Sequence, residues 1–410
     1  MNRLPKETQM GAQLQLNYQW THFWLILAGM WTMGGAIPIQ AKQTQPVVIH
    51  SVTLIDGESD EAVENATVIF QQGRISSISM ARKPPFPEGA VVIDGTGKFL
   101  IPGLWDMHAH LSYWGEDALG MLVNAGVTSI RELGGDPDEI EGWMARIQSG
   151  ELVGPSMVWC GPYVEGLEAE DEYRLKVGTT KEARVAAHTL KDRGVDFIKI
   201  QPRIARDLVE ALVSEANSVG LSVVGHVPQG LSAIEASALG LRSIEHLSPY
   251  LQLSEEELEA TIQTLLKNGT WVSPALFSLV APFVASGEDP SMDEKIQKAY
   301  SIVRRFYEAG VPLLLGANFA YRDWPQQPGS GLHGEMVAFV DAGIPAMEVI
   351  KMATAQAARF SGKSQDFGRI IVGKVADMVL LDQDPLRDIH HIHSTNSVIL
   401  RGEIMVPMSK

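Results

Sequence analysis

Short apolar runs alternate with longer amphipathic segments through most of this 410-residue chain. Runs such as VTSI, FIKI, SVVGH and PLLLGA are separated by stretches such as KEARVAAHTLKDRG and SEEELEATIQTLLKNG. Buried strands that alternate with helices are typical of βα units around a parallel sheet. The stretch 104–361 is close to the ~250 residues of a (β/α)8 barrel. We therefore predict an α/β fold with this barrel; a doubly wound sheet is the alternative, but no G-x-G-x-x-G follows the early strands.

The two ends of the chain follow a β pattern. Residues 47–103 contain β-branched runs that end at glycine, such as VVIHSVTLIDG and ATVIFQQGRISSIS, and the tail returns to this style in ADMVLLDQDP and SVILRGEIM. We predict that 45–103 and 362–410 are the two parts of one small β-sandwich, which the barrel domain at 104–361 interrupts in the sequence.

The N-terminus has the layout of a targeting segment. Residues 8–41 carry no Asp, Glu, Lys or Arg, and 23–39 within them is strongly apolar. Arg3 and Lys6 precede this run and small residues follow it, which is the order of a secretory signal peptide. We predict that 1–41 is a signal peptide and that the mature protein is exported, periplasmic or secreted, without stable membrane association. An uncleaved membrane anchor is the alternative.

Charge and cysteine content narrow the classes of function. The chain has 33 Lys+Arg and 49 Asp+Glu, a formal net charge of −16. An acidic chain does not attract polyanions, so nucleic acid is not an expected partner. The single cysteine, Cys160, excludes an intrachain disulfide and a Cys-based metal cluster. A bound metal would have to be held by His, carboxylate or a less usual ligand.

Polar residues that suit a metal site end several predicted strands. His108 and His110 stand two apart in GLWDMHAHL, so in a strand both imidazoles face one side. Lys199 lies in the apolar run VDFIKI, where a bare ammonium is costly to desolvate. His226 and His246 end LSVVGH and SIEH. Barrel enzymes build their active sites at the carboxyl ends of the strands, so we predict that these five side chains converge there.

These motifs resemble the amidohydrolase superfamily over nearly the whole chain that follows the predicted signal. TLIDG, ATVIFQQGRI and IPGLWDMHAHL look like its opening sandwich and first barrel strand, and GVTSIREL looks like its second strand. DFIKI, GHV and IEHL look like strands four, five and six. MATAQAARFSG and VGKVADMVLLDQDPLRDI look like the closing helix and the returning sandwich, with a specific Gly-Lys-x-Ala-Asp motif. The chain is most similar to the exported imidazolonepropionase-like branch, which includes metal-dependent dipeptidases and ochratoxin-cleaving amidases.

The resemblance implies a site with two divalent metal ions, by default Zn²⁺. His108 and His110 would bind the more buried ion, and His226 and His246 the more exposed ion. Lys199 would be carboxylated by CO2 and bridge the two ions as a carbamate. A hydroxide shared by the ions would attack the carbonyl of an amide or dipeptide bond in a small, carboxylate-bearing substrate. Assembly as a homo-oligomer is compatible with this function.

Asn318 departs from the family pattern at a catalytic position. The family has Gly-Thr-Asp after the eighth strand, and this chain has Gly316-Ala317-Asn318. An amide can offer a neutral oxygen ligand, but it cannot take up and return a proton as a carboxylate does. Hydrolysis would then be slow, unless a carboxylate such as Asp323 or Glu335 replaces it. A catalytically weakened metal- or ligand-binding protein, an altered chemistry and an engineered Asp→Asn change are the alternatives.

Three further residues are candidates for substrate binding. Tyr163, Arg203 and His333 follow predicted strands, and an arginine suits a substrate carboxylate. The tract His390-His391-Ile392-His393 resembles a metal tract in composition, but it falls in the returning β region, so we expect a solvated loop there. A mononuclear deaminase is disfavoured because no acidic residue closely follows His226 and because Lys199 would have no role.

Overall fold

The computed structural model describes residues 45–405, except 82–83, 170–171, 287–289 and 321–326. The described residues all belong to one compact unit of the chain, Ile37–Lys410. The predicted signal peptide at 1–41 and the candidate Asp323 lie outside the described residues. Among the described residues, no helix has both the length and the apolar character that a membrane span requires.

Parallel strands form the middle of the chain, as two sheets. The first sheet has the order β6-β7-β8 and the second has the order β10-β9-β11-β12-β13-β14. Every pair of neighbouring strands in both sheets is parallel. The bounds are β6 (Leu104–Ala109), β7 (Val127–Glu132), β8 (Ser156–Trp159), β9 (Tyr163–Glu165), β10 (Arg174–Lys176), β11 (Ile198–Ile200), β12 (Val223–Gly225), β13 (Ser243–Glu245) and β14 (Trp271–Ser273).

Helices lie between and after these strands, and several of them have residues at their ends that are typical of helix caps. Thr179 caps the helix 180–193 in a capping box with Glu182, and Gly194 ends the helix with φ +83°. The helices are α1 (Asp117–Asn124), α2 (Pro137–Ser149), α3 (Thr180–Arg193), α4 (Arg206–Ser218), α5 (Ala233–Ala238), α6 (Glu255–Asn268), α7 (Leu276–Ser286), α8 (Pro290–Ala309), α9 (Ser330–Asp341), α10 (Ala346–Lys351), α11 (Ala357–Phe360), η1 (Leu111–Tyr113), η2 (Ser248–Tyr250), η3 (Met352–Gln356) and η4 (Ile389–His393).

The predicted α/β class is confirmed, but the described residues do not form a closed eight-stranded barrel. The extended segment 313–318 follows α8, where an eighth strand was expected. The Leu314 N–H donates to Val272 O of β14 (2.9 Å), and the Asn318 N–H donates to His108 O of β6 (2.8 Å). The segment therefore makes backbone hydrogen bonds to a strand of each sheet. These hydrogen bonds do not form a regular ladder, so the two sheets are not joined into one.

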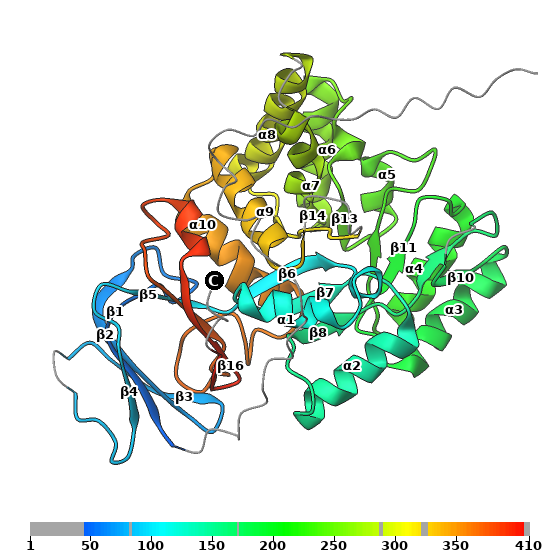
Figure 1. The fold of residues 1–410 in the computed structure, drawn as a ribbon. Coiled ribbons are helices and arrows are strands. Elements are labelled where there is room, and N and C mark those ends of the chain that lie inside the picture. The colour runs from blue at the N-terminus through cyan, green and yellow to red at the C-terminus, as the bar shows by residue number, and fades with distance from the viewer. Residues whose placement is uncertain (1–44, 82–83, 170–171, 287–289, 321–326, 406–410) are drawn as a thin grey trace, which may run out of the picture. The chain divides into compact units, whose positions relative to one another are not determined.

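The two ends of the chain share one mixed sheet of eight strands. Its order is β17-β16-β15-β5-β1-β2-β3, and β4 pairs with β1. The bounds are β1 (Val47–Leu54), β2 (Val63–Gln71), β3 (Arg74–Ser79), β4 (Val91–Asp94), β5 (Phe99–Pro102), β15 (Met378–Leu381), β16 (Thr395–Leu400) and β17 (Glu403–Met405). The blue N-terminal strands and the red C-terminal segment lie together in Figure 1. The structure records a single sheet here and not the two facing sheets of the predicted sandwich.

This terminal sheet has an apolar core of its own. Alternate residues of β1, such as Val47 and Ile49, pack with Phe70 of β2, Leu100 of β5 and Met378 of β15, and all five are fully buried. β15 pairs antiparallel with β5, so residues about 280 positions apart in the sequence are neighbours in the sheet. The β-branched runs at both ends of the chain explain why they associate, since neither end alone could bury its apolar face.

Candidate active site

Four histidines gather where the parallel strands end. His108 belongs to β6, His110 directly follows it, His226 follows β12, and His246 follows β13. The ring centroids are 5.2 Å apart for His110 and His108, 4.8 Å for His108 and His246, and 4.6 Å for His246 and His226. The structure therefore places the four predicted histidines in one continuous group of rings.

The backbone at the ends of β12 and β13 helps to direct these rings. Gly225 has φ +145°, and a Cβ at this position would lie 2.3 Å from Ile200 O of β11. Only glycine allows such a close approach, and His226 follows it directly. His246 itself has φ +69°, an uncommon conformation for a residue with a side chain. The chain therefore turns sharply at both positions to present an imidazole beyond the strand.

Lys199 lies on β11 and is fully buried. Its Nζ has no hydrogen-bond partner among the described residues. Burial lowers the pKa of Lys199 to about 8, although the negative charge of Glu245 opposes this shift. A buried amine without a partner is unusual in a folded protein, because its desolvation is not compensated. A role for Lys199 in a functional site stays a prediction, and it would account for this feature.

The same burial keeps the imidazoles neutral. It lowers the pKa of His110 to about 3 and that of His246 to about 4, and the charge of Lys199 acts in the same direction. The pKa values of His108 and His226 also lie well below the ordinary value, again mainly because of burial. Neutral imidazole is the form that binds metal ions.

The buried nitrogen atoms of this site suit a metal ion in their chemistry, but in this structure they do not surround a common point. Neither ring nitrogen of His108 makes a well-aligned hydrogen bond, and Nδ1 of His226 also has no partner among the described residues. With Lys199 Nζ, these are buried polar atoms that a cation would satisfy. In the present geometry, however, the described His, Cys, Asp and Glu side chains include no group of three or more placed to hold one ion.

Tyr163 of β9 contacts a predicted metal ligand. Its Oη lies 3.1 Å from His110 Nδ1 and donates a hydrogen bond to Gly134 O (3.0 Å). The same His110 nitrogen lies 3.1 Å from Gly134 O. Tyr163 is 2% exposed, and the Arg174 guanidinium lies 5.0 Å from its ring centroid. These contacts orient His110, and they place Tyr163 beside the predicted site.

Arg203 lies just after β11, beside a buried carboxylate. Its N–H donates to Glu165 Oε1 (3.0 Å), and its Nε lies 3.6 Å from the same oxygen. Arg174 approaches the other oxygen of Glu165 to 2.8 Å. Two guanidinium groups therefore share one carboxylate, which leaves a net positive charge next to Tyr163.

The structure places His333 elsewhere. Its Nε2 lies 2.8 Å from Ala125 O, and its Nδ1 lies 3.0 Å from His393 Nδ1 of η4. Ala125 stands before the start of β7, whereas Gly134, the contact of His110, stands after its end. A strand of this length spans about 20 Å. The contacts of His333 therefore give no support to its predicted role in substrate binding.

Asn318 ends the extended segment 313–318 and is 9% exposed. Its Nδ2 donates a weak hydrogen bond to Ser278 Oγ (3.4 Å), and its φ of +51° is a conformation that Asn and Asp tolerate better than most residues. Because its N–H bonds to His108 O, the side chain begins next to the histidine group.

Glu335 was considered as a replacement for the missing aspartate, but its carboxylate is already engaged. The two oxygens accept the N–H groups of Leu276 (2.9 Å) and Phe277 (2.5 Å) at the start of α7. Burial raises the pKa of Glu335 to about 8, and these two hydrogen bonds only partly oppose the shift. The arrangement indicates that Glu335 caps a helix rather than serving the reaction.

The Glu335→Gln variant tests this assignment through the pH dependence of stability. The folded pKa of about 8 exceeds the ordinary 4.5, so between these values the folded state holds the proton more often than the unfolded state. The contribution of this group to stability therefore falls as pH rises, by at most about 1.4 kcal/mol per unit of pKa difference. We expect the variant to gain stability relative to the parent between pH 5 and pH 8, measured by urea unfolding. A pH-independent difference would contradict the assignment.

Several buried charged residues near the site were not singled out from the sequence. Asp106 stands two residues before His108 on the same face of β6, and burial raises its pKa to about 7. Arg131 of β7 and Glu245 of β13 form an ion pair of 2.8 Å, with both side chains fully buried. A signal in the sequence could have identified these three residues, because each is a charged residue inside an apolar run: LWDMH, VTSIRE or SIEH.

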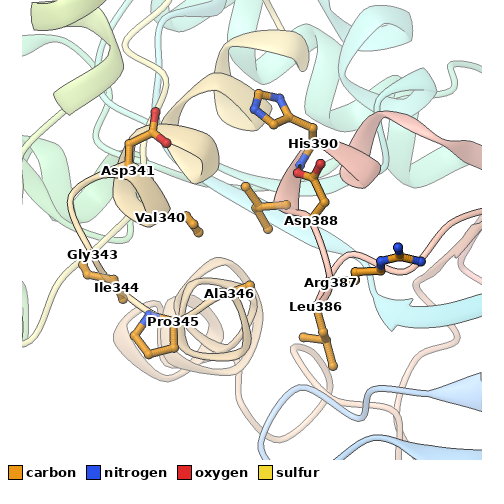
Figure 2. Close-up of a pocket in the computed structure, with 11 residues that line it drawn as sticks. Val340, Asp341, Gly343, Ile344, Pro345, Ala346, Leu386, Arg387, Asp388 and His390 are labelled. Atoms are coloured by element: carbon orange, nitrogen blue, oxygen red, sulfur yellow. Dashed lines mark hydrogen bonds between the residues drawn. The ribbon is translucent and has the colours of Figure 1, made fainter.

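An open cavity of about 460 Å³ lies away from the histidine group. It lies between the end of α9, with Asp341, and the segment from Leu386 to His390 (Figure 2). His390 and Asp388 face it from one side and Asp341 from the other. This position of His390 agrees with the prediction that the HHIH tract lies away from the active site.

An α/β scaffold of parallel strands, with neutral histidines and a buried lysine in or just after the strands, is the layout of a hydrolase built on βα units. Residues 99–405 match the Amidohydrolase family. The chain belongs to this family. It is therefore a hydrolase of the class that acts on amide or amidine bonds, and membership implies the use of divalent metal.

Known relatives agree with this assignment. The chain is 24% identical to the ochratoxinase of Aspergillus niger, with 85% of this chain and 83% of that protein covered. It is 25% identical to the imidazolonepropionase of Shewanella baltica (strain OS223), with 78% and 87% covered. Among solved structures, a Xaa-Pro dipeptidase with methionine bound in its active site matches with a TM-score of 0.73 at 22% identity, covering 88% of this chain and 100% of that one.

Proposed function

We propose that this protein hydrolyses the amide C–N bond of a small, carboxylate-bearing molecule such as a dipeptide. The observation that carries the proposal is the group of four neutral histidines, of which His108 and His110 are buried, together with Lys199, whose buried Nζ has no hydrogen-bond partner among the described residues. Core packing does not require this set of residues, and each of them would gain from a bound cation.

His108 and His110 would hold one divalent ion, and His226 and His246 would hold a second; zinc suits imidazole ligands. Lys199 would join them as a carbamate, since adding CO2 turns a costly buried cation into an anionic oxygen ligand. When bound, such ions polarise a carbonyl and lower the pKa of water. The chain's own residues orient the ligands: Tyr163 and Gly134 O hold His110 from behind.

We propose that the substrate's carboxylate is recognised on the side of Arg203. The two guanidinium groups around Glu165 supply the positive charge, and Arg203 keeps 38% of its side chain exposed. Tyr163 links this charge to the histidine group through His110. A guanidinium is well suited to bind a carboxylate in a bidentate manner.

Other parts of the proposal concern the whole protein. We propose that 1–41 is a signal peptide, that the mature protein is exported and works without stable membrane association, and that it assembles as a homo-oligomer. We also propose that 313–318 serves as the eighth strand of the barrel, with the terminal sheet in the place of the family's sandwich. Small molecules, and not nucleic acids, are the expected partners of a chain with a net charge of −16.

Asn318 favours a second candidate function. The amide of Asn318 cannot accept a proton from water and return it to the leaving amine, as a carboxylate at this position would. Glu335, a conceivable substitute, is bound to backbone N–H groups. The second candidate is therefore a protein that binds metal and ligand on an enzyme scaffold, with little turnover.

Metal content and hydrolysis of a dipeptide panel test both candidates. We expect about two divalent ions per chain, slow release of amine from peptides with a free C-terminal carboxylate, weaker activity on the matching C-terminal amides, and loss of activity on chelation that added Zn²⁺ restores. Metal binding without hydrolysis of any substrate would favour the second candidate. Hydrolysis that survives complete removal of metal would contradict the first.

A further inference from the structure

A network of buried polar groups lies behind His108. Its centre is Arg131 of β7, whose Nε donates to Met107 O (2.6 Å). One terminal nitrogen donates to Ser243 Oγ (3.1 Å) and the other to Glu245 Oε2 (2.8 Å). Met107 and His108 are consecutive residues of β6, so one guanidinium bonds both to the backbone beside His108 and to a carboxylate of β13.

The guanidinium is also held on its faces. Its central carbon lies 5.1 Å from the ring centroid of Phe360 and 5.8 Å from that of Phe197. Arg131 is fully buried, so water cannot compete for its donors. The hydrogen bonds at its edges and the rings on its faces hold the planar guanidinium in one orientation.

Glu245 is fixed in turn. Its Oε1 accepts from Ser243 Oγ (2.6 Å), and its Oε2 lies between Arg131 and His108 Nδ1, at 3.3 Å from the latter. Its partner Arg131 is a buried guanidinium 2.8 Å away, so Glu245 is the anionic member of an ion pair. A carboxylate only accepts hydrogen bonds, so the 3.3 Å contact, which is close but not a well-aligned hydrogen bond, favours the His108 tautomer with hydrogen on Nδ1.

We propose that Glu245, held by Arg131, is a positioning residue that keeps His108 as the tautomer with hydrogen on Nδ1 and thereby leaves Nε2 as the metal ligand. The inference rests on the proposed function, in which His108 binds metal. Neither ring nitrogen makes a well-aligned hydrogen bond among the described residues, but Nδ1 lies 3.3 Å from the Glu245 carboxylate, so it is the lone pair of Nε2 that remains for a cation. The same carboxylate precedes His246, whose positive φ needs a firmly held strand end, so the network steadies two ligands at once.

The tautomer can be observed directly in the metal-free protein labelled with ¹⁵N-histidine. Long-range ¹H–¹⁵N spectra distinguish a protonated from an unprotonated ring nitrogen, and the His108→Asn variant assigns the signals of His108. We expect the parent to carry hydrogen on Nδ1. In Glu245→Gln, which has the same shape, we expect a mixture of tautomers and a Zn²⁺ affinity 10–100-fold lower, measured against a chromophoric chelator.

Ser243→Ala is the matched control, because it removes the hydrogen bonds of Ser243 Oγ with Glu245 Oε1 and with Arg131 but leaves Oε2 between Arg131 and His108. We expect it to retain the parent tautomer. If Glu245→Gln does not fold, the double variant Arg131→Gln/Glu245→Gln removes both charges and should show the same mixture. Hydrogen on Nε2 in the parent, or an unchanged tautomer in both Glu245 variants, would overturn the inference. An Nδ1–H tautomer in a parent that binds no metal would refute the proposed function alone.

Discussion

The Asn318→Asp variant is expected to hydrolyse its amide substrate about 10²–10⁴ times faster than the parent chain. The gain would come from general acid–base catalysis, because a carboxylate can accept a proton from water and return it to the leaving amine. The backbone already suits the change. Asn318 has φ +51°, which Asp tolerates, and its N–H is held by His108 O. Initial rates on the best peptide of the panel, at matched metal content, measure the effect.

Asn318→Gly is the control for this experiment. Glycine accepts the same backbone conformation and offers neither an amide oxygen nor a carboxylate. We expect it to be no faster than the parent, so that an increase in the aspartate variant can be assigned to the new group. If the aspartate variant is no faster than the parent on any substrate that the parent accepts, then Asn318 is not what limits the rate.

Replacing Arg131 by Met is expected to destabilise the fold by about 3–5 kcal/mol. The ion pair with Glu245 has no exposed surface, so the variant leaves a carboxylate buried without its counter-charge. It also removes the donors to Met107 O and Ser243 Oγ, and unsatisfied buried acceptors add to the cost. Urea unfolding of the metal-free protein, followed by tryptophan fluorescence, measures the loss.

The double variant Arg131→Met/Glu245→Met separates the effect of charge from the effect of shape. It removes both ions at similar volume, so we expect it to recover most of the stability that the single variant loses. The two changes should therefore be strongly non-additive. A single variant within about 1 kcal/mol of the parent, or a double variant less stable than the single one, would show that the pair does not act as we describe.

Local patterns predicted the elements well, because they depend on neighbours in the sequence. The alternation of apolar runs with amphipathic segments led to parallel strands and helices, and Thr179 with Glu182 forms a regular capping box. The two-residue spacing predicted both His108 and His110 on one strand, whereas β6 ends at Ala109 and His110 directly follows it. The sequence could not show how regularly 313–318 would pair, because this depends on the positions of β14 and β6 on either side. The predicted closed barrel is therefore not found in the described residues.

The sequence by itself determined the family, the α/β class and the residue types at the strand ends. Asn318 in place of an aspartate was also visible there. Only the tertiary structure decided which of these residues share a site, since that depends on contacts between strands far apart in the chain. It gathered His108, His110, His226 and His246 and placed His333 at the other end of β7. It also made Arg131 and Glu245 an ion pair, because a buried charge needs a partner and the partner lies on another strand.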